Sequence, residues 1–426
     1  MSLFCVIPVA LTIGALGGCS LLGGVFKSAP PPPAPVAPAP PPAPPLPTPQ
    51  ATSKFEINDD QDVIGTLQET TVGKDDTLTD IARRFNLGYE ELLRANPKVD
   101  PWLPGVGRAI VLPTRFVLPD APREGVVVNI AAMRIFYFPP RKKGQRQVVY
   151  THPIGIGKVG WSTPEGTTKI IRKQKDPTWH VPVSVMKEHK ENDDPLPSSV
   201  IGPGPDNPLG NRAFYLGWNS YLIHGTNKPA GVGLRSSHGC MRLYPEDIEE
   251  FFEMIPVGTQ VHVVNQPYVF GWDRGALVMQ SLGSLEDDRR DWKKARQRLL
   301  AKSLSPAVQK ELKSHKATVD WDRVMQLAHQ PDGLVVPVTQ PAADHDAVLA
   351  SATMVVNQLP RGASWDGKSD LPMDDKTFQQ VLGERDPQDE AAAKAAAASS
   401  QNGSSQSSIQ DSSQKKAAAN GASQGT

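Results

Sequence analysis

The sequence predicts a mainly β protein in which a sandwich-like or barrel-like β domain follows a small α/β module. Three observations lead to this fold class. Residues 124–266 contain many short β-branched or aromatic runs separated by turn residues. One helical pattern, Pro245 to Ile255, interrupts them, whereas an open parallel sheet would need a helix between successive strands. Residues 69–114 have the pattern of a strand, two helices and a second strand.

Composition indicates neither a nucleic-acid partner nor a membrane-spanning segment beyond the N-terminal region. The 426 residues include 45 Lys and Arg against 45 Asp and Glu, so the formal charge is balanced. Proteins that bind nucleic acid normally carry a basic excess, so we expect no nucleic-acid partner. Beyond the N-terminal region no stretch is long and apolar enough to span a membrane.

The N-terminal residues 1–18 form an apolar run with a small-residue end, as in a secretory signal peptide. The sequence Leu16-Gly17-Gly18-Cys19-Ser20 resembles the lipoprotein box of bacteria, which implies a lipidated Cys19. Ser20 in place of an acidic residue would favour the outer membrane of a Gram-negative cell, with the protein in the periplasm and held to the membrane by its lipid. No Lys or Arg precedes the apolar run, which departs from the pattern. An uncleaved anchor or a plain secretory signal would export the protein equally.

Residues 19–68 are expected to be a linker rich in Pro and Ala. Thirteen prolines lie between Pro30 and Pro49, and this density favours extended polyproline II over a packed fold. At about 3.1 Å per residue, roughly 20 to 30 such residues would reach about 60 to 90 Å. The segment could separate a lipid anchor from a distant polymer, or it could be an inert linker without a required length.

Residues 69–114 form the predicted α/β module. Thr77 to Asp80 fits a helix N-cap box, and apolar residues follow at helical spacing. A second helix is expected from about Tyr89 to Ala95, with flanking strands at Val72 and at Ile110 to Pro113. This unit resembles a LysM module, a family that binds N-acetylglucosamine-containing glycans such as peptidoglycan. The alternative is a small structural prodomain.

Residues 124–266 form the predicted β domain. Its helix begins at Pro245, which suits a first helical turn, and Glu246 and Asp247 complement the helix dipole there. The expected strands are Val126 to Ile130, Arg134 to Phe138, Val148 to Tyr150, Thr167 to Lys173, Ala213 to Gly217, Ser220 to His224 and Gln260 to Asn265.

The strongest chemical signal is the stretch from Ser236 to Arg242, which brings a thiol, an imidazole and a guanidinium together. A second imidazole, His224, ends an apolar run a short loop upstream. Cys240 is the only cysteine beyond the signal region, and an unpaired thiol in an exported protein points to a reactive role. An imidazole that removes its proton would make it a nucleophile.

Other interpretations of these residues stay open. Cys240 could be a small buried hydrophobe, and His224 could be a strand histidine whose hydrogen bonds are satisfied. A zinc site is disfavoured because His-x-Cys is poor ligand spacing and no second cysteine pair exists.

The motifs around the two histidines resemble the catalytic motif of the YkuD-type L,D-transpeptidases. The matching residues are His224-Gly225-Thr226-Asn227, Ser237-His238-Gly239-Cys240-Met241-Arg242-Leu243 and the helix that follows them, with supporting matches at Pro153 to Gly155, Thr163 to Gly166, Pro177 to Trp179 and Gly202 to Gly210. The resemblance covers residues 69–287, and the order of parts is similar to the periplasmic Gram-negative subgroup that acts on stems with meso-diaminopimelate. It implies a mainly β catalytic domain with one helix after the catalytic cysteine, and neither a metal nor another cofactor.

The same resemblance implies a mechanism. Family members remove the terminal D-Ala of a peptidoglycan tetrapeptide stem, hold the remaining tripeptide as a thioester and transfer it to an amine. Cys240 would be the nucleophile that attacks the third-position carbonyl. His224 would be the general base and then the acid, and the backbone carbonyl of Gly225 could hold its tautomer.

Further roles are implied for the residues around the nucleophile. His238, Gly239 and Cys240 would supply backbone N–H groups to the oxyanion. Arg242 would orient the cysteine loop or bind a substrate carboxylate. Ser237 belongs to the same catalytic motif.

Three residues are candidates for substrate binding. Trp179 and Tyr215 could line the groove for the stem peptide, although an aromatic residue in a β domain more often belongs to the core. Asn227 belongs to the motif that begins at His224.

Residues 267–385 are expected to be a partly helical C-terminal extension. Tyr268 to Trp272 and Ala276 to Met279 could form a hairpin that extends the catalytic domain. Asp287 to Leu312 is a charged amphipathic stretch, expected to form one or two helices with a solvated face. Residues 386–426 are rich in Ala, Ser, Gln and Gly and cannot bury a core, so we expect a disordered tail.

Three functions are compatible with these residues. The first is an L,D-transpeptidase, whose partners are peptidoglycan glycan strands and tetrapeptide stems. The second is a hydrolase with the same thioester chemistry, either an L,D-carboxypeptidase or an amidase. The third is a non-catalytic wall-binding scaffold, against which the intact Cys/His motif argues. The sequence does not separate transfer from hydrolysis, nor a stem acceptor from the lysine of an outer-membrane lipoprotein.

Overall fold

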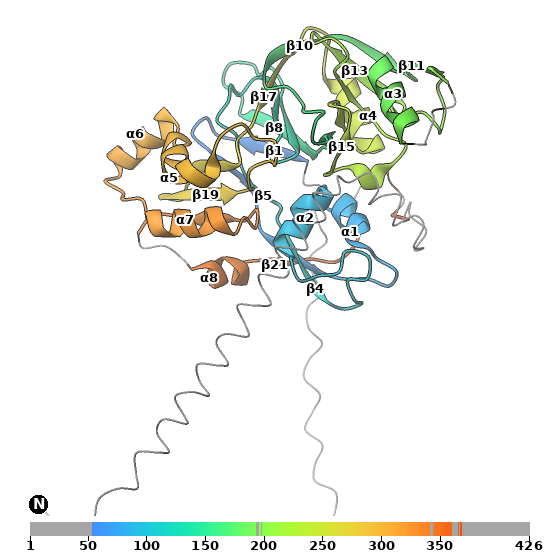
Figure 1. Cartoon of the computed structure of the whole chain (residues 1–426). Helices are drawn as coiled ribbons and strands as arrows, with labels where there is room; N and C mark the ends of the chain where they lie inside the picture. The colour runs from blue at the N-terminus through green and yellow to red at the C-terminus, as the bar shows by residue number, and fades with distance from the viewer. Residues whose placement is uncertain are drawn as a thin grey trace, which may run out of the picture. The chain divides into compact units, whose positions relative to one another are not determined.

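A computed structural model describes residues 53–359 apart from 193–195, 197 and 341–343, together with residues 365, 367 and 368 (Figure 1). The expected signal segment, Cys19 and the 386–426 tail lie outside these residues. No helix in the described part of the chain has both the length and the apolar character that a membrane crossing requires.

A nine-stranded mixed sheet forms the centre of the catalytic domain, and the prediction of a mainly β fold is confirmed. The expected strands of residues 124–266 are all present. In spatial order the sheet consists of β1 (Lys54–Ile57), β8 (Gln147–Pro153), β7 (Arg134–Phe138), β6 (Gly125–Asn129), β17 (Gln260–Val264), β10 (Gly166–Lys175), β13 (Arg212–Leu216), β14 (Leu222–His224) and β16 (Met241–Arg242).

One end of this sheet comes from the segment expected to be a linker. Strand β1 pairs antiparallel with β8, and β2 (Val63–Gly65) pairs with β5 (Arg115–Val117). Ile57 and Ile64 are each only 1% exposed. The linker prediction is therefore wrong for residues 54–65, because this short segment supplies buried apolar side chains and main-chain pairing to the folded unit.

The helix after the cysteine motif is α4 (Pro245–Met254), within one residue of its predicted end. Its apolar face, which includes Ile248 and Phe251, is buried against side chains of the central sheet such as Phe214 and Met241. The helix thus covers the face of β13, β14 and β16 to which Phe214, Ile223 and Met241 point.

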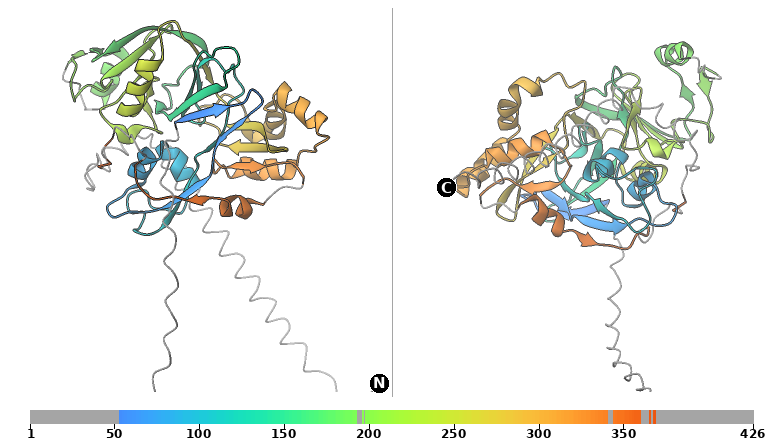
Figure 2. Two further views of the ribbon diagram at one scale, coloured as in Figure 1. Left: turned by 180° about the vertical axis from the view of Figure 1, so that it is seen from behind. Right: turned by 60° about the horizontal axis from the view of Figure 1, so that its bottom comes forward.

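A second helix of the catalytic domain was not predicted. Strand β11 (Trp179–His180) pairs with β12 (Val200–Ile201), and between them lies α3 (Val183–Glu191). Figure 2 shows this light-green segment at the edge of the catalytic domain. The helix expected after the cysteine motif is α4. The sequence did not indicate α3, because that segment has no apolar stripe: only Val185 is buried, and Val183 is 84% exposed.

The module at residues 69–114 has the predicted order of elements. It consists of β3 (Gln68–Thr71), α1 (Leu78–Arg84), α2 (Tyr89–Ala95) and β4 (Ala109–Leu112). Thr77 caps α1, with its side chain accepting from the Asp80 N–H and the Asp80 carboxylate accepting from the Thr77 N–H. The first strand ends at Thr71, just before the expected Val72.

The C-terminal extension forms a three-stranded sheet with helices beside it. The hairpin expected near residue 270 is present, but it pairs with β20 and is not continuous with the nine-stranded sheet. The elements are β18 (Tyr268–Asp273), β19 (Ala276–Ser281), α5 (Trp292–Lys302), α6 (Pro306–Ser314), α7 (Trp321–His329), β20 (Val335–Pro337), α8 (His345–Ala350) and β21 (Thr353–Met354).

The extension also completes the LysM-like module, because β21 pairs in parallel with β3. The Asn357 side chain binds both the Thr71 carbonyl and the Asp76 carboxylate, and Arg84 donates to Asn357. These contacts join segments almost 290 residues apart in the sequence.

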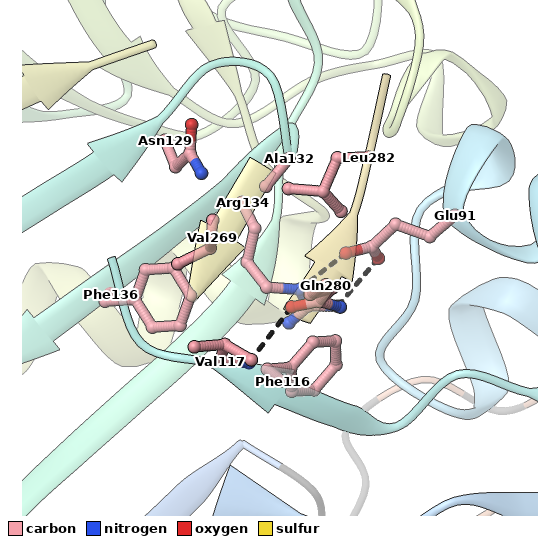
Figure 3. A pocket seen from close by; sticks show the side chains of 10 residues that line it. All are labelled: Glu91, Phe116, Val117, Asn129, Ala132, Arg134, Phe136, Val269, Gln280 and Leu282. Atoms are coloured by element: carbon pink, nitrogen blue, oxygen red, sulfur yellow. Dashed lines mark hydrogen bonds and ion pairs between the residues drawn. The ribbon is translucent and has the colours of Figure 1, made fainter. Parts of the chain in front are cut away.

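A buried ion pair connects the LysM-like module with the catalytic domain. Arg134 on β7 donates to both carboxylate oxygens of Glu91 on α2, each at 2.7 Å (Figure 3). The Arg134 side chain is 1% exposed and that of Glu91 is 7% exposed. Arg134 also donates to the Asn86 carbonyl at 2.8 Å, and its guanidinium lies over the Phe116 ring. This buried ion pair and an apolar cluster with side chains from both domains therefore join the two domains.

We predict that Arg134→Met destabilises the whole protein, because it leaves the buried Glu91 carboxylate without its charge partner. Loss of one member of a buried ion pair costs about 3 to 5 kcal/mol. Urea unfolding followed by tryptophan fluorescence measures the effect. Arg141→Ala, which removes an exposed partner of Asp59, should leave the unfolding midpoint unchanged. Equal midpoints for the two variants would contradict a stabilising role of the domain interface.

Candidate active site

The nucleophile candidate Cys240 lies directly before β16, beside β14. The two strands are parallel, with Ile223 opposite Met241 and His224 opposite Arg242. Side chains alternate along a strand, and Ile223 and Met241 both point into the apolar core. Cys240, His224 and Arg242 therefore lie on the other face of the sheet. The structure brings together the thiol and the imidazole that the sequence singled out.

The turn that carries Cys240 has a defined shape. Gly239 has a φ of +101°, and an added Cβ atom would lie 2.8 Å from the Tyr221 ring. The Ser237 hydroxyl donates to the Cys240 carbonyl at 2.6 Å and accepts from the Gly239 N–H at 3.1 Å. Thr163 donates from its hydroxyl to the Gly239 carbonyl at 3.0 Å. Glycine at position 239 is thus required by both backbone conformation and space.

The structure changes one expected role in this turn. The N–H of Gly239 was expected to face a substrate oxyanion, but it is already bonded to Ser237. Among the hydrogen bonds of the described residues, none uses the N–H of His238 or Cys240. These two groups stay the candidates for oxyanion donors, and Ser237 acts by shaping the turn.

His224 is 3% exposed and held in one orientation. Its Nδ1 lies 2.6 Å from the Gly225 carbonyl, which can only accept, so Nδ1 carries the proton and Nε2 keeps a lone pair. Burial, together with the positive charge of Arg242, lowers the pKa of His224 to about 3, although the carbonyls of Gly225 and Leu209 oppose the shift. The imidazole is therefore neutral in the free protein, and its Nε2 carries no proton.

The Cys240 thiol is protonated in the free protein. Its sulfur lies 3.6 Å from the Ser220 carbonyl, to which it can donate. Burial raises the pKa of Cys240 to about 11, although the Leu222 N–H and Arg242 act in the opposite direction. Within the described residues no hydrogen bond joins the thiol to His224. The resting pair is thus a neutral thiol and a neutral imidazole, and the proton must move when substrate binds.

Arg242 lies beside His224 on the neighbouring strand. Its Nη1 donates to the Ser236 hydroxyl at 3.1 Å, and its backbone forms two hydrogen bonds with Gly155. Of the two roles expected for Arg242, these contacts support orientation of the cysteine loop.

A group that sequence reasoning missed lies next to the nucleophile turn. His238 Nε2 lies 2.6 Å from the Glu188 carboxylate of α3. Glu188 also forms an ion pair with Lys158, and the Trp161 ring contacts His238 edge-on. Burial and the charge of Lys158 lower the pKa of His238, while Glu188 raises it. Glu188 is 50 residues away in the sequence, so no local pattern could have indicated it.

The three expected substrate residues do not form one cluster. Tyr215 is opposite Leu222, which places it on the same face and in the same row as Cys240. Arg172 completes this row, with its guanidinium 3.6 Å from the centre of the Tyr215 ring. Trp179 lies instead in the β11–β12 segment, partly exposed, and Asn227 is exposed in the turn after β14.

The fold is a mainly β domain that carries a cysteine and a neutral histidine on one face of two neighbouring strands. A family model described as the L,D-transpeptidase catalytic domain matches residues 123–263, and a LysM domain model matches residues 70–113. The LysM match favours the LysM interpretation of this module over a structural prodomain.

Several proteins named as L,D-transpeptidases are similar to this chain. The YbiS protein of Escherichia coli K12 is 42% identical over 208 residues, which are 48% of this chain and 66% of that protein. ErfK/SrfK of Salmonella typhimurium is 42% identical over 194 residues, 45% of this chain and 61% of that protein. The chain thus spans slightly less than two thirds of the length of these relatives.

A third relative settles the family. YkuD of Bacillus subtilis is 30% identical over 195 residues, which are 45% of this chain and 96% of that protein. The chain therefore belongs to the YkuD-type L,D-transpeptidase family, as the sequence motifs indicated.

We predict that alkylation of Cys240 by iodoacetamide accelerates about tenfold per pH unit between pH 7 and 9.5, because only the thiolate reacts and the pKa of the thiol is raised. Intact-mass spectrometry measures the rate. A Cys240→Ser variant corrects for labelling of Cys5 and Cys19. A rate that already levels off near pH 7 would mean that Cys240 is a preformed thiolate.

Proposed function

We propose that this protein is an L,D-transpeptidase that acts on peptidoglycan tetrapeptide stems through a thioester on Cys240. The observation that carries the proposal is the pairing of β14 with β16, which places Cys240 and a neutral, oriented His224 on one face of the sheet. The intact motif from Ser237 to Arg242 and the family membership agree with it.

In the first half-reaction, Cys240 attacks the carbonyl of the third stem residue. His224 Nε2 accepts the thiol proton and later delivers it to the leaving D-Ala amine. Because both groups are neutral in the free protein, proton transfer accompanies attack. The N–H groups of His238 and Cys240 bind the oxyanion, and Arg242 holds the loop in place through Ser236.

The face of the sheet beside Cys240 supplies the surface for the donor stem. Tyr215, Leu222 and Cys240 lie in one row across β13, β14 and β16, and Arg172 extends this row. A guanidinium next to an aromatic ring suits a peptide with free carboxylates, because it binds them with two parallel hydrogen bonds.

The acceptor of the second half-reaction is an amine, either of a second stem or of the lysine of an outer-membrane lipoprotein. Water in place of the amine would give an L,D-carboxypeptidase or an amidase. We choose transfer because the relatives that the chain resembles are named as L,D-transpeptidases.

We also propose that the LysM domain binds the glycan strands of the same polymer. The α2–β4 loop supports this, because Leu103 and Val106 are each 72% exposed and Trp102 stacks on Tyr89 beside them. Apolar surface of this kind can pack on sugar rings. A lipid on Cys19 and a periplasmic location at the outer membrane agree with this substrate, on the basis of the sequence motif alone.

The first test is mass spectrometry of disaccharide tetrapeptide incubated with the full chain. Wild-type protein should release D-Ala and form a dimer joined through third-position residues. Cys240→Ala should show neither product and should unfold like the wild type, since Cys240 lies on the face of the sheet opposite the apolar core. His224→Ala should reduce D-Ala release by at least about 100-fold, because it removes the general base. Full turnover by either variant would exclude the mechanism, and tripeptide without dimer, even after addition of a lysine peptide, would favour the hydrolase.

The second test concerns the glycan site. Deleting the LysM domain would expose the core that it shares with the catalytic domain, so point variants are required. Leu103→Asp with Val106→Asp should weaken sedimentation with peptidoglycan sacculi and leave release of D-Ala from a soluble stem unchanged. Lys142→Asp, in an exposed loop of the catalytic domain, is the control. Undiminished sedimentation of the double variant would exclude this loop as the glycan site.

A further inference from the structure

Glu188 lies at the edge of the candidate active site, where three parts of the chain meet. Its carboxylate contacts His238, which is two residues before the nucleophile. The Lys158 N–H donates to the Ser237 carbonyl at 2.9 Å. The preceding residue, Gly157, packs so closely on the turn that a Cβ atom there would lie 3.0 Å from the Gly239 Cα. Glu188 and its partners are thus in direct contact with the turn that carries Cys240.

The Glu188 carboxylate already holds a primary ammonium group. One of its oxygens pairs with Lys158 Nζ, and the other pairs with His238 Nε2. Burial would raise the pKa of Glu188, but Lys158 and His238 together lower it, so the group is an anion. The Lys158 ammonium is carried by an unbranched aliphatic chain. The acyl acceptor of the proposed second half-reaction carries the same chemical group.

The Lys158 ammonium can be replaced by another one. The side chains of Lys158 and Glu188 are 25% and 23% exposed, so water reaches both. Ion pairs between water-accessible side chains contribute little to stability, and a lysine side chain has many alternative rotamers. An incoming ammonium can therefore take the place of Lys158 without disturbing the fold.

We propose that Glu188 and His238 form the acceptor subsite, which binds the primary ammonium of the acyl acceptor, and that Lys158 occupies this subsite when no acceptor is bound. This inference rests on the proposed transferase function and deepens it. Glu188 comes from α3, so the helix that the sequence did not predict would provide the acceptor side of the active site.

The reaction at this subsite is aminolysis of the Cys240 thioester. The acceptor amine attacks the carbonyl carbon of the Cys240 thioester, a C–N bond forms and the C–S bond breaks. The ammonium loses two protons in total. One of them ends on the Cys240 sulfur, and the other is released to water. Glu188 binds the ammonium before attack and is not consumed.

A purely structural role for Glu188 gives different expectations. If Glu188 only fastened α3 to the nucleophile turn, removal of either Glu188 or Lys158 would loosen the same contact. Both variants would then impair thioester formation. In the subsite interpretation the two variants act in opposite directions on acceptor affinity, because Glu188 binds the acceptor and Lys158 competes with it.

The experiment measures the two half-reactions separately in the full-length protein. Disaccharide tetrapeptide forms the thioester, which is followed by intact-mass spectrometry. Its decay is then recorded in water alone and against rising concentrations of two acceptors, a second tetrapeptide stem and a peptide with a C-terminal lysine. The variants are Glu188→Gln and Lys158→Met. Glu191→Gln is the matched control, since Glu191 lies on the same helix and pairs only with Lys187 among the ion pairs of the described residues.

We expect Glu188→Gln to raise the half-saturating acceptor concentration about three- to five-fold, with thioester formation and decay in water close to the wild type. Lys158→Met should lower the half-saturating concentration, and Glu191→Gln should not change it. The acceptor that shows both opposite shifts is the one that uses the subsite. An unchanged acceptor dependence in Glu188→Gln would overturn the inference, as would equal losses of thioester formation in both variants. Absence of any thioester in the wild type would instead overturn the proposed function itself.

Discussion

The candidate active site depends on one constraint, the register of the parallel pair formed by β14 and β16. Ile223 and Met241 hold this register because both are buried in the apolar core under α4. A slip of one residue would move Cys240 to the core face and separate it from His224. The polar chemistry on one face is therefore fixed by apolar packing on the other, and the Leu243 N–H closes the pair by donating to the His224 carbonyl at 2.9 Å.

The same packing extends to the LysM domain and the C-terminal extension. The LysM helices share an apolar cluster with the catalytic sheet, and the buried Glu91–Arg134 pair also joins them. The extension reaches the active site through Asp287, which accepts from Arg235 at 2.8 Å and from the Ser162 hydroxyl at 2.6 Å. The LysM domain, the catalytic domain and the extension thus form one folded unit in the described part of the chain.

The electrostatics of the site suit a nucleophile that is activated only when needed. Burial keeps the proton on Cys240 and keeps His224 neutral. A protonated thiol resists oxidation better than a thiolate. Charged groups lie next to this uncharged pair and its turn. Arg242 is beside His224, and Glu188 is beside His238.

Local sequence patterns determined those parts of the protein in which neighbouring residues carry the information. The Thr77 capping box, the helix that begins at Pro245 and the alternation of the main strands all follow from side chains close in sequence. The motif around Cys240 indicated a cysteine nucleophile because its residues are close together in the sequence and lie in one turn. Tertiary structure alone decided the pairing of β1 with β8, the parallel addition of β21 to the LysM sheet and the contact of Glu188 with His238. Each of these depends on contacts between segments that are distant in the sequence. The strands involved are short and α3 is only weakly amphipathic, so their sequence patterns are too weak to be recognised in isolation.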